Sequence, residues 1–254
     1  MKPIIIIAAV KQEVELLEKA LEHSGRVKSG GFEYVEGTVG NLRVVVCAGG
    51  IGKVNAAAAT AVMIDRYQPQ LVVNTGCAGA YAGSGLVVGN LVVASEEVLA
   101  DDGVVVAEGW KDLSYMKLAT VEQGGLTCYN VLPLSRHAAE KAMRLADYYG
   151  VFLMRGRSAT VSTCSGTSQQ GAEQVWRWNA LIENMEGGAV AQVCLRCAVD
   201  CLEIRGISNL VEERDVKKWD IPRAVEAAQR FVLKYLEEMD RPDSAPVRKA
   251  TPEL

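Results

Sequence analysis

The residues with the most chemical promise lie in two short segments in the last third of the chain. Glu183–Ala189 holds carboxylates beside small residues that let a helix pack closely. Glu203–Asn209 has the pattern of a short apolar strand that ends in the polar groups Ser208 and Asn209. A carboxylate can accept hydrogen bonds from sugar hydroxyls, and polar groups at a strand end can reach the edge of a base. Together the two segments indicate a pocket for a sugar and a base.

A carboxylate outside these two segments, Glu13, lies in the first turn predicted for the helix that follows the first strand. An acid at this position commonly complements the helix dipole and needs no further role. In an open α/β sheet, however, the same position faces the crevice beyond the strand ends, where ligands bind. Glu186, beside Gly187 and Gly188, has two similar interpretations, as a solvated or capping residue or as a ligand. Position alone decides neither case.

Glycine-rich runs in the first third of the chain do not match the known nucleotide-binding loops. The run Gly49–Lys53 lacks the Walker A spacing, because Cys47 and Val54 stand where glycine and a hydroxyl residue are required. Gly76–Gly79 lacks the G-x-G-x-x-G spacing of a dinucleotide-binding turn. The first run is therefore predicted to be a tight turn from strand to helix.

Cys194, Cys197 and Cys201 form a C-x-x-C-x-x-x-C pattern that invites comparison with a metal site. With Val190 they occupy positions i, i+4, i+7 and i+11 of what is predicted to be one helix, which is a single face. Such a stripe of small apolar groups is typical of core packing, so we expect no metal there. The seven cysteines of the chain fit reduced, mostly buried thiols.

Length and composition fit one large domain. At 254 residues, 49% of them hydrophobic and 23% charged, the chain can bury a full core. We expect residues 1–240 to form a single domain and residues 241–254, a polar stretch with three prolines, to be a flexible tail. A net charge of −4 without a basic block argues against a nucleic-acid partner. Ile4–Val10 has no convincing cleavage site, and no apolar run is long enough to cross a bilayer, so a cytoplasmic protein without membrane contact is expected.

Short apolar runs alternate with helical stretches, which predicts an α/β fold: a three-layer sandwich with a central mixed, largely parallel sheet. The predicted strands are Ile4–Val10, Phe32–Gly37, Leu42–Cys47, Leu71–Asn74, Asn90–Ser95, Ala159–Ser162 and Leu202–Ile207. The predicted helices are Lys11–His23, Lys53–Arg66, Ser135–Tyr149, Gly171–Asn179, Asn184–Cys201 and Pro222–Met239. Residues 98–127 are predicted to form irregular loops near the pocket.

The ordered set of segments resembles the nucleoside phosphorylase and nucleosidase superfamily, in particular the methylthioadenosine/S-adenosylhomocysteine nucleosidases. This resemblance covers nearly the whole chain, through the segments Ile7–Val14, Gly50–Ala56, Asn74–Gly79, Met185–Glu186 and Arg205–Ser208. Within the superfamily the chain looks most like the futalosine hydrolases, through the segments Asn74–Tyr81, Ser162–Thr167, Glu183–Gly187, Gly206–Leu210 and Arg214–Ile221. Any one segment is weak evidence, whereas the ordered set is specific. A phosphorylase/hydrolase-like fold is thereby implied.

The resemblance implies roles for the residues that match. Glu13 matches the carboxylate that orients and activates the attacking water, and Arg205 matches an arginine near that water. Glu186 matches the carboxylate that holds the ribose hydroxyls, with Met185 against the sugar. Cys77 stands where the adenine-specific nucleosidases have serine. The further substrate-binding positions that the resemblance implies are Ala78, Gly79 and Ser208.

The base-contacting position is the main departure from the adenine-specific nucleosidases, because Asn209 stands where they carry aspartate. Cleavage of an N-ribosidic bond places positive charge on the sugar and negative charge on the base, so catalysis needs an anion, a positioned water and a donor toward purine N7. Glu186, Glu13 and Asn209 can fill these three tasks in that order. Hypoxanthine has acceptors at both O6 and N7, which suit the amide NH₂ of Asn209.

The resemblance implies hydrolysis of futalosine to hypoxanthine and dehypoxanthine futalosine, on the futalosine route to menaquinone. No cofactor is expected, and the family usually forms homo-oligomers. One alternative is a methylthioadenosine/S-adenosylhomocysteine or aminodeoxyfutalosine nucleosidase. A second is a purine nucleoside phosphorylase, which needs cations for phosphate, yet residues 4–24 and 74–85 hold no arginine.

A third alternative is a non-catalytic nucleoside-binding protein, against which the presence of both Glu13 and Glu186 argues. For the benzoate end of futalosine, Lys111, Arg155 and Arg157 are candidates by charge alone.

Overall fold

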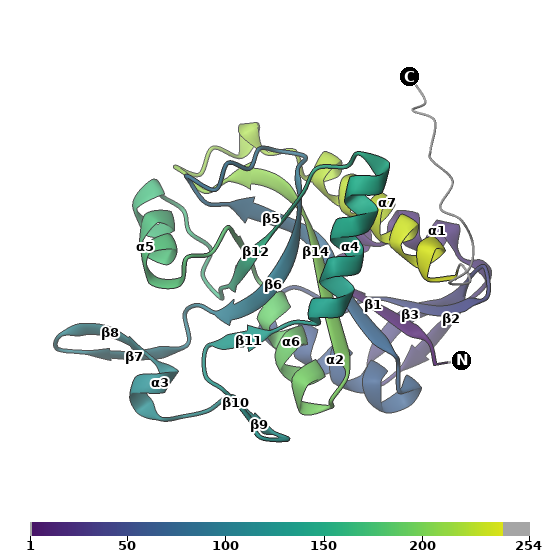
Figure 1. Cartoon of the computed structure of the whole chain (residues 1–254), viewed down its shortest axis with the longest axis horizontal. Helices are drawn as coiled ribbons and strands as arrows, with labels where there is room; N and C mark the ends of the chain where they lie inside the picture. Colours follow the sequence, from purple (N-terminus) through teal and green to yellow (C-terminus); the bar gives the residue numbers. More distant parts are fainter. Residues whose placement is uncertain (1, 241–254) are drawn as a thin grey trace.

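The structure is a computed structural model that describes residues 2–240 of the 254-residue chain. Within this range one large sheet runs through the molecule, and helices cover both of its faces (Figure 1). This arrangement confirms the predicted α/β class with a mixed sheet. The tail predicted at 241–254 lies outside the described residues. Among residues 2–240, none of the helices has both the length and the apolar character that spanning a bilayer requires.

The strands of the main sheet are β1 (Ile4–Ala8), β2 (Glu22–Ser29), β3 (Phe32–Val39), β4 (Leu42–Ala48), β5 (Leu71–Ala80), β6 (Leu91–Leu99), β11 (Val131–Pro133), β12 (Leu153–Thr160), β13 (Ile182–Asn184) and β14 (Asp200–Leu210). Two small hairpins consist of β7 (Gly103–Val106) with β8 (Gly109–Asp112) and β9 (Val121–Gln123) with β10 (Leu126–Cys128). The helices are α1 (Glu15–Ala20), α2 (Lys53–Tyr67), α3 (Leu113–Met116), α4 (Arg136–Tyr149), α5 (Ser168–Trp178), α6 (Gly187–Arg196) and α7 (Ile221–Asp240), with 3₁₀ turns at Lys11–Glu13 and Val216–Lys218.

The first strand shows why the sheet lies between two helical layers. Successive side chains of a strand point to opposite faces. Ile4 and Ile6 belong to the apolar core that contains residues of α1, α4 and α7. Ile5 and Ile7 belong to the core on the other face, with residues of α2 and α6. Because both faces of β1 are buried, its sequence is a continuous isoleucine run rather than an alternation of apolar and polar residues.

Strand β14 closes part of the sheet onto itself. It pairs in parallel with β5 and antiparallel with β6. Strand β6 pairs with β12, β12 with β13, and β13 with β5, so these five strands form a closed ring. In the main sheet five strand pairings are parallel and five are antiparallel, so the sheet is mixed but less parallel than its sequence predicts. The closure brings β5, β13 and β14 together, and residues of all three strands line the pocket described below.

The helix predicted at Lys11–His23 is wrong at its C-terminal end. After the 3₁₀ turn, α1 ends at Ala20 and β2 begins at Glu22. Strand β2 is an edge strand with mostly exposed polar residues. Such a strand lacks the apolar alternation by which a half-buried strand is recognised, because it has no buried face.

The irregular loops predicted at 98–127 are also wrong. Val98 and Leu99 continue β6, and the two hairpins and α3 occupy most of the remaining residues. In Figure 1 the β7–β8 hairpin extends away from the body of the molecule. None of residues 98–127 lines the pocket described below. Short hairpins of this kind have little apolar periodicity, so they are not recognisable from the sequence.

The helix predicted at Asn184–Cys201 is divided among three elements. Asn184 ends the short strand β13, α6 covers Gly187–Arg196, and Cys201 lies in β14. The backbone turns at Ala198, whose φ of 53° is left-handed. Glu186 therefore occupies the N-cap position of α6, without a side-chain capping hydrogen bond, and does not lie within a helix.

Candidate functional site

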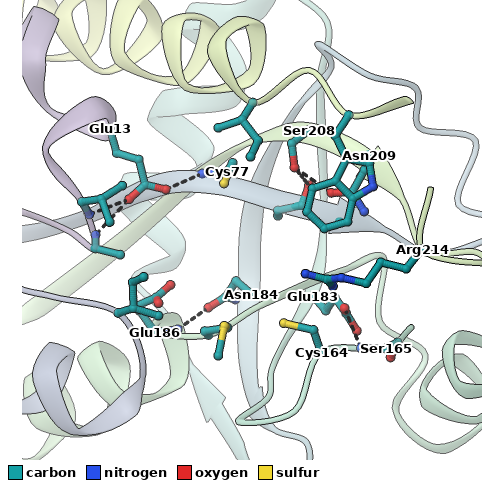
Figure 2. A pocket seen from close by; sticks show the side chains of 18 residues that line it. Glu13, Cys77, Cys164, Ser165, Glu183, Asn184, Glu186, Ser208, Asn209 and Arg214 are labelled. Carbon is teal, nitrogen blue, oxygen red and sulfur yellow. Dashed lines mark hydrogen bonds between the residues drawn. The ribbon is translucent and has the colours of Figure 1, made fainter. Parts of the chain in front are cut away.

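A cavity of about 260 Å³ opens where the ends of β5, β13 and β14 meet the turn after β1. This is the edge at which open α/β sheets bind their ligands. Figure 2 shows Glu13 and Glu186 toward one end of the pocket, and Asn209 and Arg214 toward the other. The predicted site residues that line it are Glu13, Cys77, Ala78, Gly79, Met185, Glu186, Ser208 and Asn209. Arg205 is not among the lining residues.

Backbone donors hold both oxygens of the Glu13 carboxylate. Oε2 accepts from the N–H groups of Ala9 at 2.9 Å and Val10 at 3.2 Å, and Oε1 accepts from the Cys77 N–H at 3.0 Å. The side chain is 4% exposed. A side chain at Gly76 would collide with Glu13 Oε1 and with Arg205, so the glycine permits this close approach. Glu13 is thus a carboxyl group held in a fixed position at the pocket surface.

Glu186 faces the pocket from the start of α6. Its Oε1 accepts from the Gly52 N–H at 2.9 Å, and Oε2 lies 3.7 Å from Nη1 of Arg205. Burial raises the pKa of Glu186, although Arg205 and the Gly52 N–H each act to lower it. Met185, which precedes it, also lines the pocket. A carboxylate with an apolar neighbour suits a ribose, which presents hydroxyls on one face and carbon on another.

Arg205 lies behind the pocket wall and links the elements that form it. Its Nη2 donates to Oδ1 of both Asn74, at 2.5 Å, and Asn184, at 3.3 Å, and Nη1 donates to the Cys77 carbonyl at 3.5 Å. The side chain is 1% exposed. Burial acts to lower the pKa of Arg205, but the surrounding glutamates, Glu203 first, raise it above its ordinary value. Arg205 is therefore a buried cation that can orient groups of the wall.

Two glutamates lie close together beneath Arg205. Glu97 accepts from Thr160 Oγ1 at 2.7 Å and from Asn184 Nδ2 at 2.7 Å. Glu203 Oε1 lies 3.4 Å from Arg205 Nε. Burial first, and then the charge of Glu203, raise the pKa of Glu97 well above its ordinary value. The two carboxyl groups thus share a buried site beside one arginine.

Asn209 and Ser208 lie at a bulge near the end of β14. The pairing of β14 with β5 shifts register between Ile207 and Asn209, and a bulge re-aims the side chains of its strand. Ser208 Oγ donates to Asn209 Oδ1 at 2.8 Å, and Asn209 Nδ2 donates to the Leu210 carbonyl at 3.0 Å. One N–H of the Asn209 amide is left to face the pocket.

Cys77 lies in the pocket wall beside Glu13. Burial, and then the charge of Glu13, raise the pKa of the Cys77 thiol to about 12. The thiol is therefore neutral near pH 7 and is unsuited to act as a nucleophile.

The other cysteines correct the predicted stripe. Cys194 lies in α6 and Cys201 in β14, both buried, whereas Cys197 is exposed beyond the end of α6. They therefore do not share one helical face. Among the described residues, no group of three or more histidine, cysteine, aspartate or glutamate side chains could hold a metal ion.

Several residues of the pocket wall are absent from the predicted site. Glu183, Cys164, Ser165, Arg214 and Trp219 all line it. All five lie in segments that carry the resemblance to the futalosine hydrolases. The sequence therefore pointed to these segments, but it assigned no role to these five residues. The predicted benzoate contacts do not reach the pocket: Lys111 lies in β8 and Arg155 in β12, and Arg157 is held by Glu96 and by the Trp178 carbonyl. Charge alone does not reveal which way a strand faces.

Comparison with known proteins places this geometry in a family. Residues 3–237 match the model of the Phosphorylase superfamily. A 5'-methylthioadenosine/S-adenosylhomocysteine nucleosidase of Bacillus thuringiensis is 31% identical over 239 residues, which cover 93% of this chain and 99% of that protein. The crystal structure of the corresponding Neisseria meningitidis nucleosidase in complex with methylthio-immucillin-A is 27% identical, has a TM-score of 0.82 and covers 94% of this chain and 100% of its own.

A Colwellia psychrerythraea nucleosidase in complex with adenine is 26% identical, with a TM-score of 0.80 and coverage of 92% of this chain and 94% of its own. The family match over residues 3–237 includes every residue that lines the pocket. The chain belongs to the phosphorylase superfamily, as an N-glycosyl hydrolase of the nucleosidase type.

Proposed function

We propose that the chain hydrolyses the N-ribosidic bond of a 6-oxopurine nucleoside, with futalosine as substrate and hypoxanthine and dehypoxanthine futalosine as products. The observation that carries the choice of base is Asn209, whose amide lies at the end of the pocket away from Glu13 and Glu186. One N–H of this amide is held by the Leu210 carbonyl, and the other can donate to the O6 and N7 edge of hypoxanthine, where both atoms are acceptors. The place of this reaction on the futalosine route to menaquinone is part of the same proposal.

The three polar groups of the pocket divide the work of glycoside cleavage. Glu13, held by three backbone N–H groups, orients and deprotonates the attacking water. Glu186 accepts from the ribose hydroxyls and stabilises positive charge that develops on the sugar, while Met185 packs against the ring. Asn209 donates toward N7 of the departing base, where negative charge accumulates.

Arg205 acts through other groups rather than by touching the substrate. It is a positioning residue, since its guanidinium bridges Asn74, Asn184 and the carboxylate of Glu186. The pocket wall is completed by Ala78, Gly79 and Ser208, which take no part in the reaction. The neutral Cys77 thiol is a weak hydrogen-bond donor beside Glu13.

A second candidate is a methylthioadenosine/S-adenosylhomocysteine nucleosidase, or one acting on aminodeoxyfutalosine. The names of the relatives favour it, because the Bacillus thuringiensis, Neisseria meningitidis and Colwellia psychrerythraea proteins are all nucleosidases of that kind. The two candidates share the cleavage chemistry of Glu13 and Glu186 and differ at the base. A phosphorylase is disfavoured, because the buried Arg205 is already shared among Glu186, Glu203 and two asparagines.

The proposal also includes a cytoplasmic homo-oligomer. Ile51 lines the pocket and is 59% exposed, and the neighbouring Val54 is 83% exposed. Apolar surface beside a binding pocket is typical of a site to which a second subunit contributes. Sedimentation at micromolar concentration, with Val54→Glu as the variant, tests the assembly; a monomeric parent protein would contradict it.

One incubation separates the candidates. Purified protein is given futalosine, inosine and methylthioadenosine in parallel, with and without inorganic phosphate, and the released base is identified by mass spectrometry. We expect hypoxanthine from futalosine, at a rate that phosphate leaves unchanged. Preferential release of adenine from methylthioadenosine would establish the second candidate instead, and a rate that requires phosphate would identify a phosphorylase.

A further inference from the structure

A third carboxylate, Glu183, lies in the pocket wall beside Asn209, and nothing in the chemistry of Glu13 and Glu186 uses it. The sheet register fixes this neighbourhood: Gly79 of β5 pairs with Glu183 of β13 on one side and with Asn209 of β14 on the other. A Cβ built on Gly79 would lie 3.2 Å from Asn209 Nδ2 and 3.6 Å from Glu183 Cγ. The two polar side chains therefore converge beside one glycine.

The Glu183 carboxylate is rigidly held but still has room to accept. Its Oε1 accepts from the Ser165 N–H and its Oε2 from the Tyr81 hydroxyl, each at 3.0 Å. Figure 2 shows the carboxylate and Ser165 at the same end of the pocket as Asn209 and Arg214. Each carboxylate oxygen has two lone-pair sites, so both retain one after these bonds. Burial of a carboxylate, here 6% exposed, is costly, and an apolar residue would pack more cheaply if the wall had only a structural role.

The pattern of groups fits one purine edge better than the other. A 6-oxopurine presents a donor at N1–H, then acceptors at O6 and N7, whereas a 6-aminopurine presents an acceptor at N1 and a donor at N6. We propose that Glu183 is a specificity-determining residue that accepts a hydrogen bond from N1–H of the 6-oxopurine base while Asn209 donates to its O6 and N7 edge. This inference rests on the proposed function and identifies the residue that distinguishes the 6-oxopurine from the 6-aminopurine base.

The carboxylate also excludes the competing base. By taking the Ser165 N–H, Glu183 removes a backbone donor that would otherwise suit the N1 acceptor of adenine. It replaces that donor with a hydrogen-bond acceptor opposite the N1 lone pair. Discrimination therefore has an attractive part for the lactam and a repulsive part for the amino form, which is a general route to specificity.

A structural role for Glu183 makes different predictions. If Glu183 served only to tie Ser165 and Tyr81 to β13, its loss would lower activity on all nucleosides by the same factor. Loss of a base contact changes the ratio between substrates. The ratio of kcat/KM values is thus the informative readout, and it is insensitive to a uniform loss of active enzyme.

The test uses the 6-oxopurine nucleoside that the enzyme cleaves best, its 1-deaza analogue, which replaces N1–H by C–H, and its 6-amino counterpart. In the unmodified enzyme we expect kcat/KM for the oxo substrate to exceed that for the 1-deaza analogue by roughly tenfold or more, the effect of leaving a buried acceptor unpaired. In Glu183→Met this ratio should fall to within roughly threefold, and relative activity on the amino counterpart should rise. Glu173→Met, on the exposed face of α5, is the matched control and should keep the parent ratios.

The outcomes separate the two proposals. If the parent enzyme cleaves the oxo substrate but accepts the 1-deaza analogue equally well, the role of Glu183 is refuted while the proposed function stands, and this comparison does not depend on any variant folding. Unchanged ratios in a folded Glu183→Met protein, checked by its melting temperature, refute it as well. If the parent enzyme cleaves no 6-oxopurine nucleoside, the proposed function fails and the inference fails with it.

Discussion

At the scale of single residues, the backbone holds the groups that carry the charge. Both oxygens of Glu13 and one oxygen of Glu186 accept from main-chain N–H groups. Backbone donors cannot change rotamer, so the carboxylates keep their directions when the ligand enters or leaves. Such preorganisation is the main means by which enzymes stabilise developing charge.

Glu13→Gln tests the base. The amide keeps the size of the side chain but cannot take a proton from water, so we expect kcat to fall by roughly two to four orders of magnitude while substrate binding is preserved. Steady-state kinetics and calorimetric binding of a non-hydrolysable analogue measure the two effects separately. Glu15→Gln, an exposed neighbour, is the control. Near-normal turnover of the Glu13→Gln protein would remove Glu13 from the mechanism.

Asn209→Asp tests the donor to the base. A carboxylate cannot donate to O6 or N7, so activity on futalosine should fall by roughly tenfold or more, as expected for an unpaired polar group in a dry pocket. Relative activity on 6-amino analogues should rise, because aspartate accepts from the amino group. The ratio of kcat/KM for futalosine to that for aminodeoxyfutalosine is the measurement. A parent enzyme that already prefers the 6-amino substrate would show this interpretation of Asn209 to be wrong.

A site residue can be predicted from the sequence when a local pattern places it, and cannot be when long-range strand pairing places it. Glu13, Glu186 and Asn209 lie next to strand and helix ends that apolar runs predict, so a local pattern together with the family resemblance brings them into one pocket. The role inferred for Glu183 depends on the antiparallel pairing of β13 with β5. That pairing joins residues about a hundred positions apart, and nothing in the sequence near Glu183 encodes it.

At the scale of elements, strand ends and helix starts build the pocket. β5 and β14 run parallel in register, which sets Arg205 opposite Gly76. Helix α6 starts at Gly187, where a side chain would collide with the carboxyl groups of Glu97 and Glu203. The long apolar strands could be predicted because a strand buried on both faces has a continuous run of apolar residues in its sequence. β2 and β13 were not, since one is polar and exposed and the other has only three residues.

The division of the predicted cysteine helix into α6 and β14 leads to a prediction about metals. Buried Cys194 and Cys201 lie in different elements, and Cys197 is exposed, so the three thiols lack the convergent geometry that a metal requires. Purified protein should carry no stoichiometric zinc or iron by elemental analysis, and activity should survive a chelator. Cys197→Ser should match the parent protein in both assays. Tightly bound metal that is lost from that variant would reverse this interpretation.

At the scale of the whole molecule, the ring of β5, β6, β12, β13 and β14 encloses a polar centre. Arg205 lies there with Glu97, Glu203 and Asn184, all buried. Its groups contact one another across strands that are distant in sequence. Glu203 Oε2 and Arg205 Nε are buried there without a hydrogen-bond partner. Catalytic geometry and stability therefore share a set of contacts, because the same arginine reaches Glu186 at the pocket surface.

Replacing Arg205 should therefore affect folding as well as turnover. Arg205→Met keeps an elongated side chain of similar reach but leaves Glu203 and Glu186 without their cation, and breaking a buried ion pair from one side typically costs about 3–5 kcal/mol. For a chain of this length that loss corresponds to a melting temperature lower by roughly 6 °C or more. Differential scanning calorimetry measures it, with Arg230→Met as the control, since the exposed pair of Arg230 with Glu226 contributes under about 1 kcal/mol. Should Arg205→Met melt within about 2 °C of the parent protein, the arginine contributes little to stability and serves the active site alone.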